Sequence, residues 1–191
     1  MRDVLPDLVR RVAAGEVVGV GTVVATFSSA PRPPGAAMLV GADGAAVGSV
    51  SGGCVEGAVH ELALGVVGGG APVLRRFGVS DDDAFDVGLT CGGIIDVYVE
   101  AVSAAGFPEL PLVDASVRAG EAVAVATAVE HPTRAGARLV VWPDRVAGGS
   151  GRRGWTTPWP TTRAGCSRRG AAGCCGTGRT GSGGARGCRC S

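Results

Sequence analysis

The stretch Glu16-Val17-Val18-Gly19-Val20-Gly21-Thr22-Val23-Val24 begins a run of mostly β-branched residues that extends to Phe27. β-Branched and aromatic side chains favour extended backbone, and a short apolar run of this kind is typical of a strand inside a sheet. We therefore predict a buried strand over residues 17–27 and build the rest of the fold outward from it.

A similar stretch follows 105 residues later, as Glu121-Ala122-Val123-Ala124-Val125-Ala126-Thr127-Ala128-Val129. Residues 35–40 likewise resemble residues 136–141, at an offset of 101, and Asp43 and Asp144 then match at the same turn. A shorter loop in the second copy accounts for the four-residue difference. The pattern predicts an internal duplication, although two strand-loop-strand hairpins of similar composition remain an alternative.

Hydrophobic periodicity around this strand predicts a mixed α/β (α+β) N-terminal domain with an incomplete internal repeat. Asp43-Gly44 is a strong hairpin signal. We expect a first α/β unit over residues 1–103, a truncated second repeat unit over residues 104–148, and a tail over residues 149–191. The expected helices cover residues 4–14 and 55–67, and the expected strands cover residues 17–27, 37–40, 46–50, 73–79 and 94–102, with further strands from Val123 and Leu139.

The two ends of the chain differ in charge, although the net charge is only +1. Ten arginines and all 17 acidic residues leave residues 1–148 at −7, whereas eight arginines leave residues 149–191 at +8. The tail has 12 glycines and five cysteines but no Val, Leu, Ile, Met, Phe or Tyr. Such a segment buries too little apolar surface to offset its ordering entropy, so we predict a disordered Gly/Arg-rich tail.

The tail also has the composition of GC-rich DNA translated out of frame. With G or C at third codon positions, Trp155 to Arg163 read one base earlier gives Leu-Asp-Asp-Ala-Val-Ala-Asp-Asp-Ala, which matches residues 55–59 at an offset of 100. We predict a frameshift between about Gly148 and Trp155. An Arg/Gly-rich nucleic-acid-binding tail and a cysteine metal site stay as alternatives, but the tail lacks His and zinc-site spacing, so we expect no nucleic-acid partner.

No apolar run approaches the roughly 20 residues of a membrane span, and the start of the chain has no signal-peptide core. We therefore expect a cytoplasmic protein with reduced thiols and no membrane partner.

Two Cys-Gly-Gly sites stand out before the tail: Ser51-Gly52-Gly53-Cys54 and Cys91-Gly92-Gly93. The first places N–H groups and a thiol at a predicted helix N-terminus, where an anion binds and a thiolate forms most easily. If the two sites converge, they offer two soft ligands or a site for sulfur chemistry. The alternatives are a tight strand-to-helix turn around a small buried cysteine and a glycine bulge beside a core thiol.

Three further residues carry weaker signals. Glu56 and His60 are four residues apart on the predicted helix, as an acid/base pair or metal-ligand pair would be, but we expect a solvated surface contact. Arg32, in a proline-rich loop, either grips an anion or lies on the domain surface, and both interpretations stay open.

Four segments in this order and spacing resemble the XdhC/CoxI family, the xanthine dehydrogenase accessory proteins: residues 29–38, 48–57, 76–79 and 88–93. The resemblance covers about residues 5–148. It implies a non-catalytic accessory protein that binds the molybdenum cofactor, supports its sulfuration and delivers it to xanthine dehydrogenase-type molybdenum hydroxylases. A cysteine desulfurase and a second copy of the chain are further partners that it suggests.

The resemblance also implies which residues form the cofactor site, with Cys54 nearest the metal or sulfur. They are Arg32, Ser51, Gly52, Gly53, Cys54, Cys91, Gly92 and Gly93. Family members usually continue into a C-terminal Rossmann-like domain, which we expect this chain to lack. We also expect its second repeat to expose apolar faces and edges, the chain to aggregate, and cofactor delivery to be impaired. The alternatives are a thiol-dependent enzyme with Cys54 as nucleophile and His60 as base, and an inactive fragment of a frameshifted gene.

Overall fold

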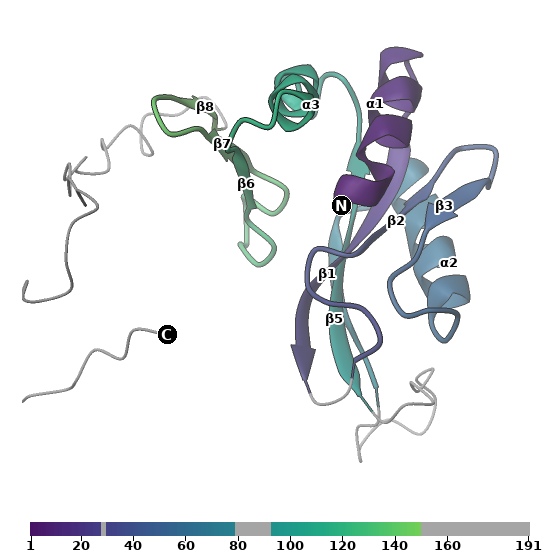
Figure 1. Cartoon of the computed structure of the whole chain (residues 1–191). Coiled ribbons are helices and arrows are strands. Elements are labelled where there is room, and N and C mark those ends of the chain that lie inside the picture. The colour runs from purple at the N-terminus through teal and green to yellow at the C-terminus, as the bar shows by residue number, and fades with distance from the viewer. Residues whose placement is uncertain (28–29, 79–92, 150–191) are drawn as a thin grey trace, which may run out of the picture. The chain divides into compact units, whose positions relative to one another are not determined.

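The computed structural model describes residues 1–27, 30–78 and 93–149 (Figure 1). The chain divides into two units, residues 1–155 and 156–191, and all of the described residues belong to the first. The predicted mixed α/β fold is confirmed, whereas the predicted disordered tail lies outside the described residues. The helices are η1 (Arg2–Val4), α1 (Leu5–Ala13), α2 (Glu56–Val67) and α3 (Leu110–Arg118), and the strands are β1 (Val18–Phe27), β2 (Ala37–Val40), β3 (Ala46–Gly48), β4 (Val73–Phe77), β5 (Ile94–Val102), β6 (Ala124–Thr127), β7 (Arg138–Val141) and β8 (Val146–Gly148).

The predicted strand at residues 17–27 forms the centre of a five-stranded antiparallel sheet with the order β3-β2-β1-β5-β4. β1 pairs with β2 through Gly19↔Val40 and with β5 along its whole length, from Val18↔Val102 to Phe27↔Ile94. Val18, Val20 and Val23 of β1 are at most 1% exposed and belong to the clusters on both faces of the sheet, as the apolar run predicted.

Helix α2 covers one face of this sheet, against β1 and β5 (Figure 1). It approaches closely because β1 carries glycine where the helix crosses it: a Cβ on Gly19 would lie 2.7 Å from the Ala63 carbonyl oxygen. The opposite face is covered by a second cluster of buried side chains, which includes Leu8 of α1, Leu110 of α3 and Val140 of β7.

The second sheet, β6-β7-β8, repeats the strand order and register of β1-β2-β3. At the offsets noted in the sequence, Gly19↔Val40 becomes Ala124↔Val141, and all four β1–β2 pairs have counterparts between β6 and β7. Gly35 and Gly136 correspond as well, with φ values of 89° and 83°, and each N–H donates to a carbonyl of the preceding strand. These matches support duplication over chance likeness of composition.

The repeat begins earlier than the strand pattern indicated. Helix α3 was not expected, but it corresponds to α1 at an offset of 105, because Leu5-Pro6 at the start of α1 matches Leu110-Pro111. After each helix comes Ala-Gly-Glu, with Gly15 and Gly120 at φ values of 86° and 68°. The boundaries near residues 103 and 148 stay a prediction.

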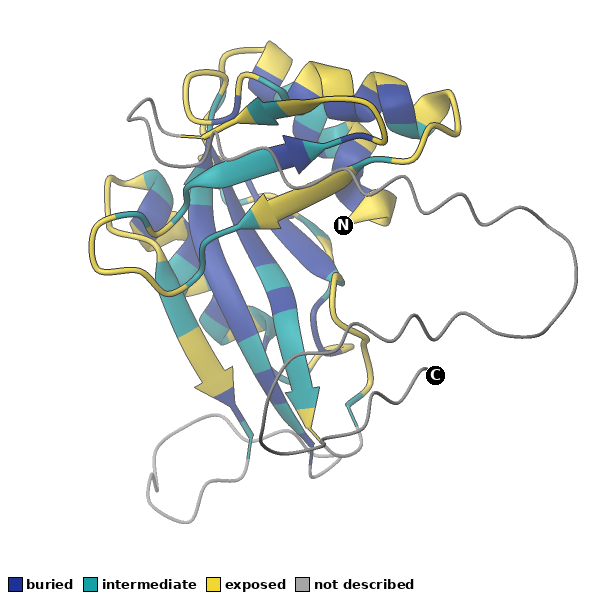
Figure 2. Cartoon of the chain, turned by 90° about the vertical axis from the view of Figure 1, so that its left-hand side faces the viewer, coloured by how far each residue is buried: buried dark blue, intermediate teal, exposed yellow. Residues whose placement is uncertain are grey.

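Two expectations about exposure were wrong. Strand β7 does not expose its apolar face, because Val140 and the adjacent Trp142 are 0% and 4% exposed within the cluster that covers the first sheet. Leu5, Leu8, Val9 and Val12 lie on one face of the predicted helix, which leaves Arg10 and Arg11 on the face expected in solvent, but the Arg11 side chain is only 11% exposed. Within the second sheet, β6 is the strand left open, with Val125 41% exposed (Figure 2).

None of the helices in the described part of the chain is long and apolar enough to span a membrane.

Candidate functional site

The first Cys-Gly-Gly site forms a loop that connects β3 to α2. Gly52 and Gly53 have φ values of 83° and 120°, a backbone conformation that favours glycine. Both are exposed, and a Cβ on either would meet nothing within 4 Å. Cys54 follows them half-buried, two residues before α2 begins. The loop therefore presents open backbone beside a thiol, as the sequence predicted.

The N–H groups of this loop do not point at an external anion, which corrects the predicted anion site. They surround the carboxylate of Glu56, the first residue of α2. Its four backbone donors are Val50, Ser51, Gly52 and Gly53, at 3.2, 2.9, 3.0 and 2.8 Å. Two hydroxyls, of Ser49 and Ser51, donate to it as well, at 2.7 and 2.5 Å. The protein supplies its own anion to the loop.

The surroundings of Glu56 favour its charged form. Partial burial raises the pKa of this carboxyl, but the hydrogen bonds from the Ser51 and Ser49 hydroxyls and the Ser51 N–H outweigh burial and lower the pKa to about 2. A carboxylate at the N-terminus of a helix is also stabilised by the helix dipole. Glu56 is therefore an anion at neutral pH and holds the loop in one conformation.

Ser51 connects this carboxylate to the start of the helix. Its hydroxyl donates to Glu56 and accepts hydrogen bonds from the N–H groups of Cys54 and Val55, both at 3.0 Å. The side chain is 2% exposed, so these contacts are protected from water. Ser51 thereby fixes the backbone of Cys54, and the sequence-predicted residues Ser51 to Cys54 form one hydrogen-bonded unit.

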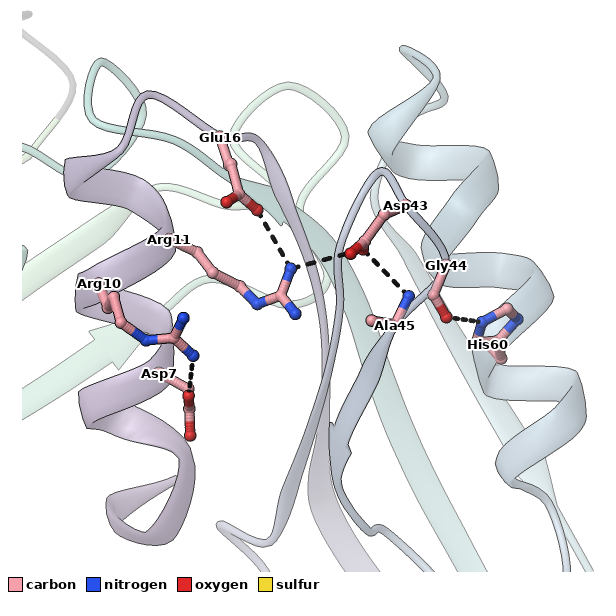
Figure 3. Close-up of polar contacts among 8 residues, drawn as sticks. All are labelled: Asp7, Arg10, Arg11, Glu16, Asp43, Gly44, Ala45 and His60. Atoms are coloured by element: carbon pink, nitrogen blue, oxygen red, sulfur yellow. Dashed lines mark hydrogen bonds and ion pairs between the residues drawn. The ribbon is translucent and has the colours of Figure 1, made fainter.

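His60 does not form the predicted contact with Glu56, either as an acid/base pair or as a solvated surface contact. Its Nε2 lies 2.9 Å from the carbonyl oxygen of Gly44, to which it donates (Figure 3). That contact gives His60 a structural partner on the β2–β3 turn. Glu56 points into the glycine loop instead, so the two side chains serve different elements.

The β2–β3 turn is also tied to α1. Asp43 accepts a hydrogen bond from the Ala45 N–H at 3.0 Å and lies 3.5 Å from Arg11, which also bonds Glu16 at 3.1 Å (Figure 3). The Ala45 N–H is the main reason that the pKa of Asp43 is lowered. Together with the His60 contact, this arrangement fixes the hairpin whose second strand leads into the glycine loop.

The remaining predicted site residues are less closely assembled. Arg32 is exposed in the loop after β1. Cys91 and Gly92 lie outside the described residues, so their convergence with Cys54 is untested. Gly93 is buried, and a Cβ on Gly78 would lie 2.7 Å from its carbonyl oxygen.

Gly93 and Cys54 are nevertheless related through the core. Cys54 packs against the buried cluster that contains Phe77 and Ile95. Phe77 pairs with Ile95 at the end of the sheet where Gly93 enters β5. The glycine loop and the start of β5 therefore share one apolar cluster.

Within residues 1–27, 30–78 and 93–149, no group of three or more His, Cys, Asp or Glu side chains is placed to hold a metal ion. A metal at this site would take at most two such side chains from the described part of the protein, with Cys54 the predicted one, and would need its other ligands from elsewhere. That donor set suits a metal that arrives within a cofactor rather than as a bare ion.

A separate cavity of about 380 Å³ lies between the two repeats. Its polar side chains include Glu100 and Arg138, 2.5 Å apart in an ion pair, and Tyr98, whose buried hydroxyl finds no hydrogen-bond partner within the part of the chain that the structure describes. Burial is the main reason that the pKa of Glu100 is raised and that of Tyr98 rises to about 12. No local sequence pattern indicates these residues, because the Glu100–Arg138 contact joins two repeats that are far apart in the chain.

The glycine loop lies within a segment of the chain that is similar to known proteins. Residues 11–78 match the model of the XdhC and CoxI family. The chain is 36% identical over 104 residues to the molybdenum cofactor insertion chaperone PaoD of Escherichia coli (strain K12), a match that covers 54% of this chain and 32% of that protein. A solved structure described as a xanthine dehydrogenase from Bacillus halodurans aligns with a TM-score of 0.64 and 25% identity, over 78% of this chain and 45% of that one. The chain thus spans about a third of the curated relative and less than half of the solved one.

Proposed function

We propose that the chain belongs to the XdhC and CoxI family, whose model matches residues 11–78, and that it is an accessory protein that binds a molybdenum cofactor for insertion into a xanthine dehydrogenase-type molybdenum hydroxylase. The match to the family model carries the proposal, because it spans both Arg32 and the glycine loop with Cys54. The similarity to a protein named as a molybdenum cofactor insertion chaperone points the same way.

The glycine loop suits this role in its chemistry. Cys54 offers one soft sulfur donor, and the exposed peptides of Gly52 and Gly53 leave room for a bulky group to approach it. When bound, the cofactor supplies the metal on which molybdenum hydroxylases carry out redox chemistry. The protein's own residues bind and orient it, with Cys54 as the contact nearest the metal or its sulfur and Arg32, Gly92, Gly93 and Cys91 as further contacts.

Glu56 has a positioning role in this proposal. Its carboxylate uses the N–H groups of Ser51, Gly52 and Gly53, so these groups hold the loop open instead of binding the cofactor's anionic part. Arg32, exposed on the neighbouring loop, remains the residue suited to pair with that anionic part. Support of sulfuration, with sulfur delivered by a cysteine desulfurase, is a further part of the proposal.

The experiment is cofactor retention by the full 191-residue chain, purified anaerobically from cells that make the molybdenum cofactor. We expect the wild-type chain to retain both molybdenum and pterin, in near-equal molar amounts to each other. Cys54→Ser should retain at least tenfold less of both, and Cys166→Ser, the same exchange in the tail, should match wild type. A wild-type chain without either component contradicts the function, whereas equal retention by Cys54→Ser contradicts only the site.

The alternative, a thiol-dependent enzyme with His60 as base, finds little support in the geometry. A base must reach its nucleophile, and the Nε2 of His60 is directed to the Gly44 carbonyl on the β2–β3 turn. We keep the accessory role as the proposal for this reason.

A further inference from the structure

The open edge of β6 corresponds to an edge that is filled in the first repeat. β1, its counterpart, pairs with β2 on one side and with β5 on the other. β6 pairs with β7 alone among the described residues, and its four residues are exposed or half-exposed (Figure 2). In the first repeat the equivalent edge is thus covered by an antiparallel strand, β5.

The backbone groups at this edge can be identified from the ladder. Ala128 exchanges hydrogen bonds with the strand that leads into β7, since its N–H donates to Ala137 and its carbonyl accepts from Gly136, each at 2.9 Å. Bonding direction alternates along an antiparallel strand, so Ala124 and Ala126 also face β7. The N–H and C=O groups of Val125 and Thr127 consequently face the open edge, where a further strand would bond them.

The cavity of about 380 Å³ lies directly against this edge and is lined by Val123, Val125, Thr127 and Val129. It is continuous with the apolar core, because Leu8 and Leu110 belong to both. Equivalent residues of the two repeats line it in pairs: Leu5 with Leu110, Leu8 with Val113, Thr22 with Thr127 and Val24 with Val129. Side chains from a strand on the edge would enter this cavity, as side chains of β5 enter the core of the first repeat.

We propose that the edge of β6 binds an extended segment of a partner protein, which adds as an antiparallel strand and places alternate apolar side chains in the cavity. The chain's own residues 149–191 contain no Val, Leu, Ile, Met, Phe or Tyr, and of their two tryptophans Trp159 lies between Pro158 and Pro160, which cannot donate hydrogen bonds to a strand ladder. A second copy paired through its own β6 would bring a whole three-stranded sheet to a cavity of about 380 Å³ that Met1, Arg2 and Leu5 already line. One strand with apolar residues at every second position matches both the edge and the cavity.

β5 suggests a probe peptide, because it fills the equivalent place. We choose the sequence of residues 94–102 with Val in the place of Glu100, flanked by two lysines at each end. Glu100 is replaced because it pairs with Arg138 of the second repeat. A strand added to β6 would face the equivalent position of the first repeat, which is Ala37. A carboxylate on the added strand would therefore have no arginine to pair with. The matched control peptide keeps the glutamate.

The experiment combines fluorescence anisotropy of the labelled peptide with amide hydrogen exchange of the full chain. We expect saturable binding, at least tenfold weaker for the glutamate peptide, and at least tenfold slower exchange at Val125 and Thr127 but not at Ala124 and Ala126. Absence of binding, or binding without protection of these two amides, overturns the proposal. So does a concentration-dependent dimer that already protects them without peptide.

Two proline variants test the edge directly. Val125→Pro removes an N–H that faces the open edge without removing a β6–β7 bond, and should weaken peptide binding at least tenfold. Val146→Pro is the matched control, since Val146 is 59% exposed and the same alternation turns its N–H to the outer edge of β8. Equal binding by both variants contradicts the proposal, and exchange in the wild-type chain decides it if Val125→Pro fails to fold.

Discussion

The two repeats share a backbone register but fill the same space with different side chains. In the first repeat, Arg11 of α1 reaches the β2–β3 turn, and Gly41 leaves room for it, since a Cβ there would clash with the guanidinium. In the second repeat, Ser116 stands in the place of Arg11 and Trp142 in that of Gly41. The Trp142 Nε1 donates to the Ser116 hydroxyl at 2.7 Å. A large and a small residue have exchanged places across one contact.

Each repeat nevertheless keeps an arginine between two carboxylates. Arg11 connects Glu16 and Asp43 from the helix, whereas Arg145 connects Glu121 and Asp144 from the turn. The guanidinium of Arg145 also lies 4.4 Å from the centre of the Trp142 ring. The backbone arrangement therefore tolerates different chemistry, provided that the volume is filled and the charges are paired.

The largest effect is expected at Trp142, which the second repeat alone uses to fill this space. Trp142→Ala removes a side chain that is 4% exposed and should lower the free energy of unfolding by about 3–5 kcal/mol, measured by urea denaturation. Trp142→Phe, which loses chiefly the bond to Ser116, should cost about 1–2 kcal/mol. A loss below about 1 kcal/mol for the alanine variant would mean that the second sheet does not share the core of the first.

The next effect concerns equivalent positions of β1 and β6, where β1 has glycine (Gly19) and β6 has alanine (Ala124). Gly19→Ala places a Cβ 2.7 Å from the rigid backbone of α2 and should cost about 1–3 kcal/mol. The reverse exchange at the equivalent exposed site, Ala124→Gly, should cost at most about 1 kcal/mol. If both variants lose the same free energy of unfolding in urea denaturation, the close approach of α2 does not explain why β1 has glycine at this position.

Much of the first repeat could be predicted from the sequence because its signals are local. The β-branched run and the turn at Asp43 set the strands, and β2 and β5 begin and end where periodicity placed them. α3 was not predicted, although its correspondence with α1 at an offset of 105 could have found it. The hydrogen-bond partners of Glu56 were not predicted, because helical spacing relates Glu56 only to His60. Its actual partners include backbone N–H groups of a loop that forms only on folding.

The third effect is the pH dependence of stability that Glu56 gives to the first repeat, the only repeat in which this loop is among the described residues. The pKa of Glu56 is about 2 in the folded chain, below its ordinary value of 4.5, so its stabilisation is present above pH 4.5 and is lost as the pH falls toward 2. After allowance for solvent screening, Glu56→Gln should cost about 1–2 kcal/mol at pH 7 and nothing near pH 2.

Chemical denaturation across pH 2–7 measures this difference, with Glu61→Gln as the matched control on the exposed side of the same helix. The control should follow wild type at every pH. If Glu56→Gln also runs parallel to wild type between pH 4.5 and 2, the carboxylate does not hold the loop.

The smallest effect separates the two bridging arginines. Arg11 has a side chain that is 11% exposed, whereas that of Arg145 is 49% exposed, so water screens the second pair of carboxylates far more. Arg11→Met should cost about 1 kcal/mol and Arg145→Met at most about 0.5 kcal/mol, since exposed ion pairs contribute little. Double-mutant cycles with Asp43→Asn and Asp144→Asn isolate each coupling energy in urea denaturation. A larger coupling at Arg145 than at Arg11 would contradict the argument that burial strengthens the ion pairs of Arg11.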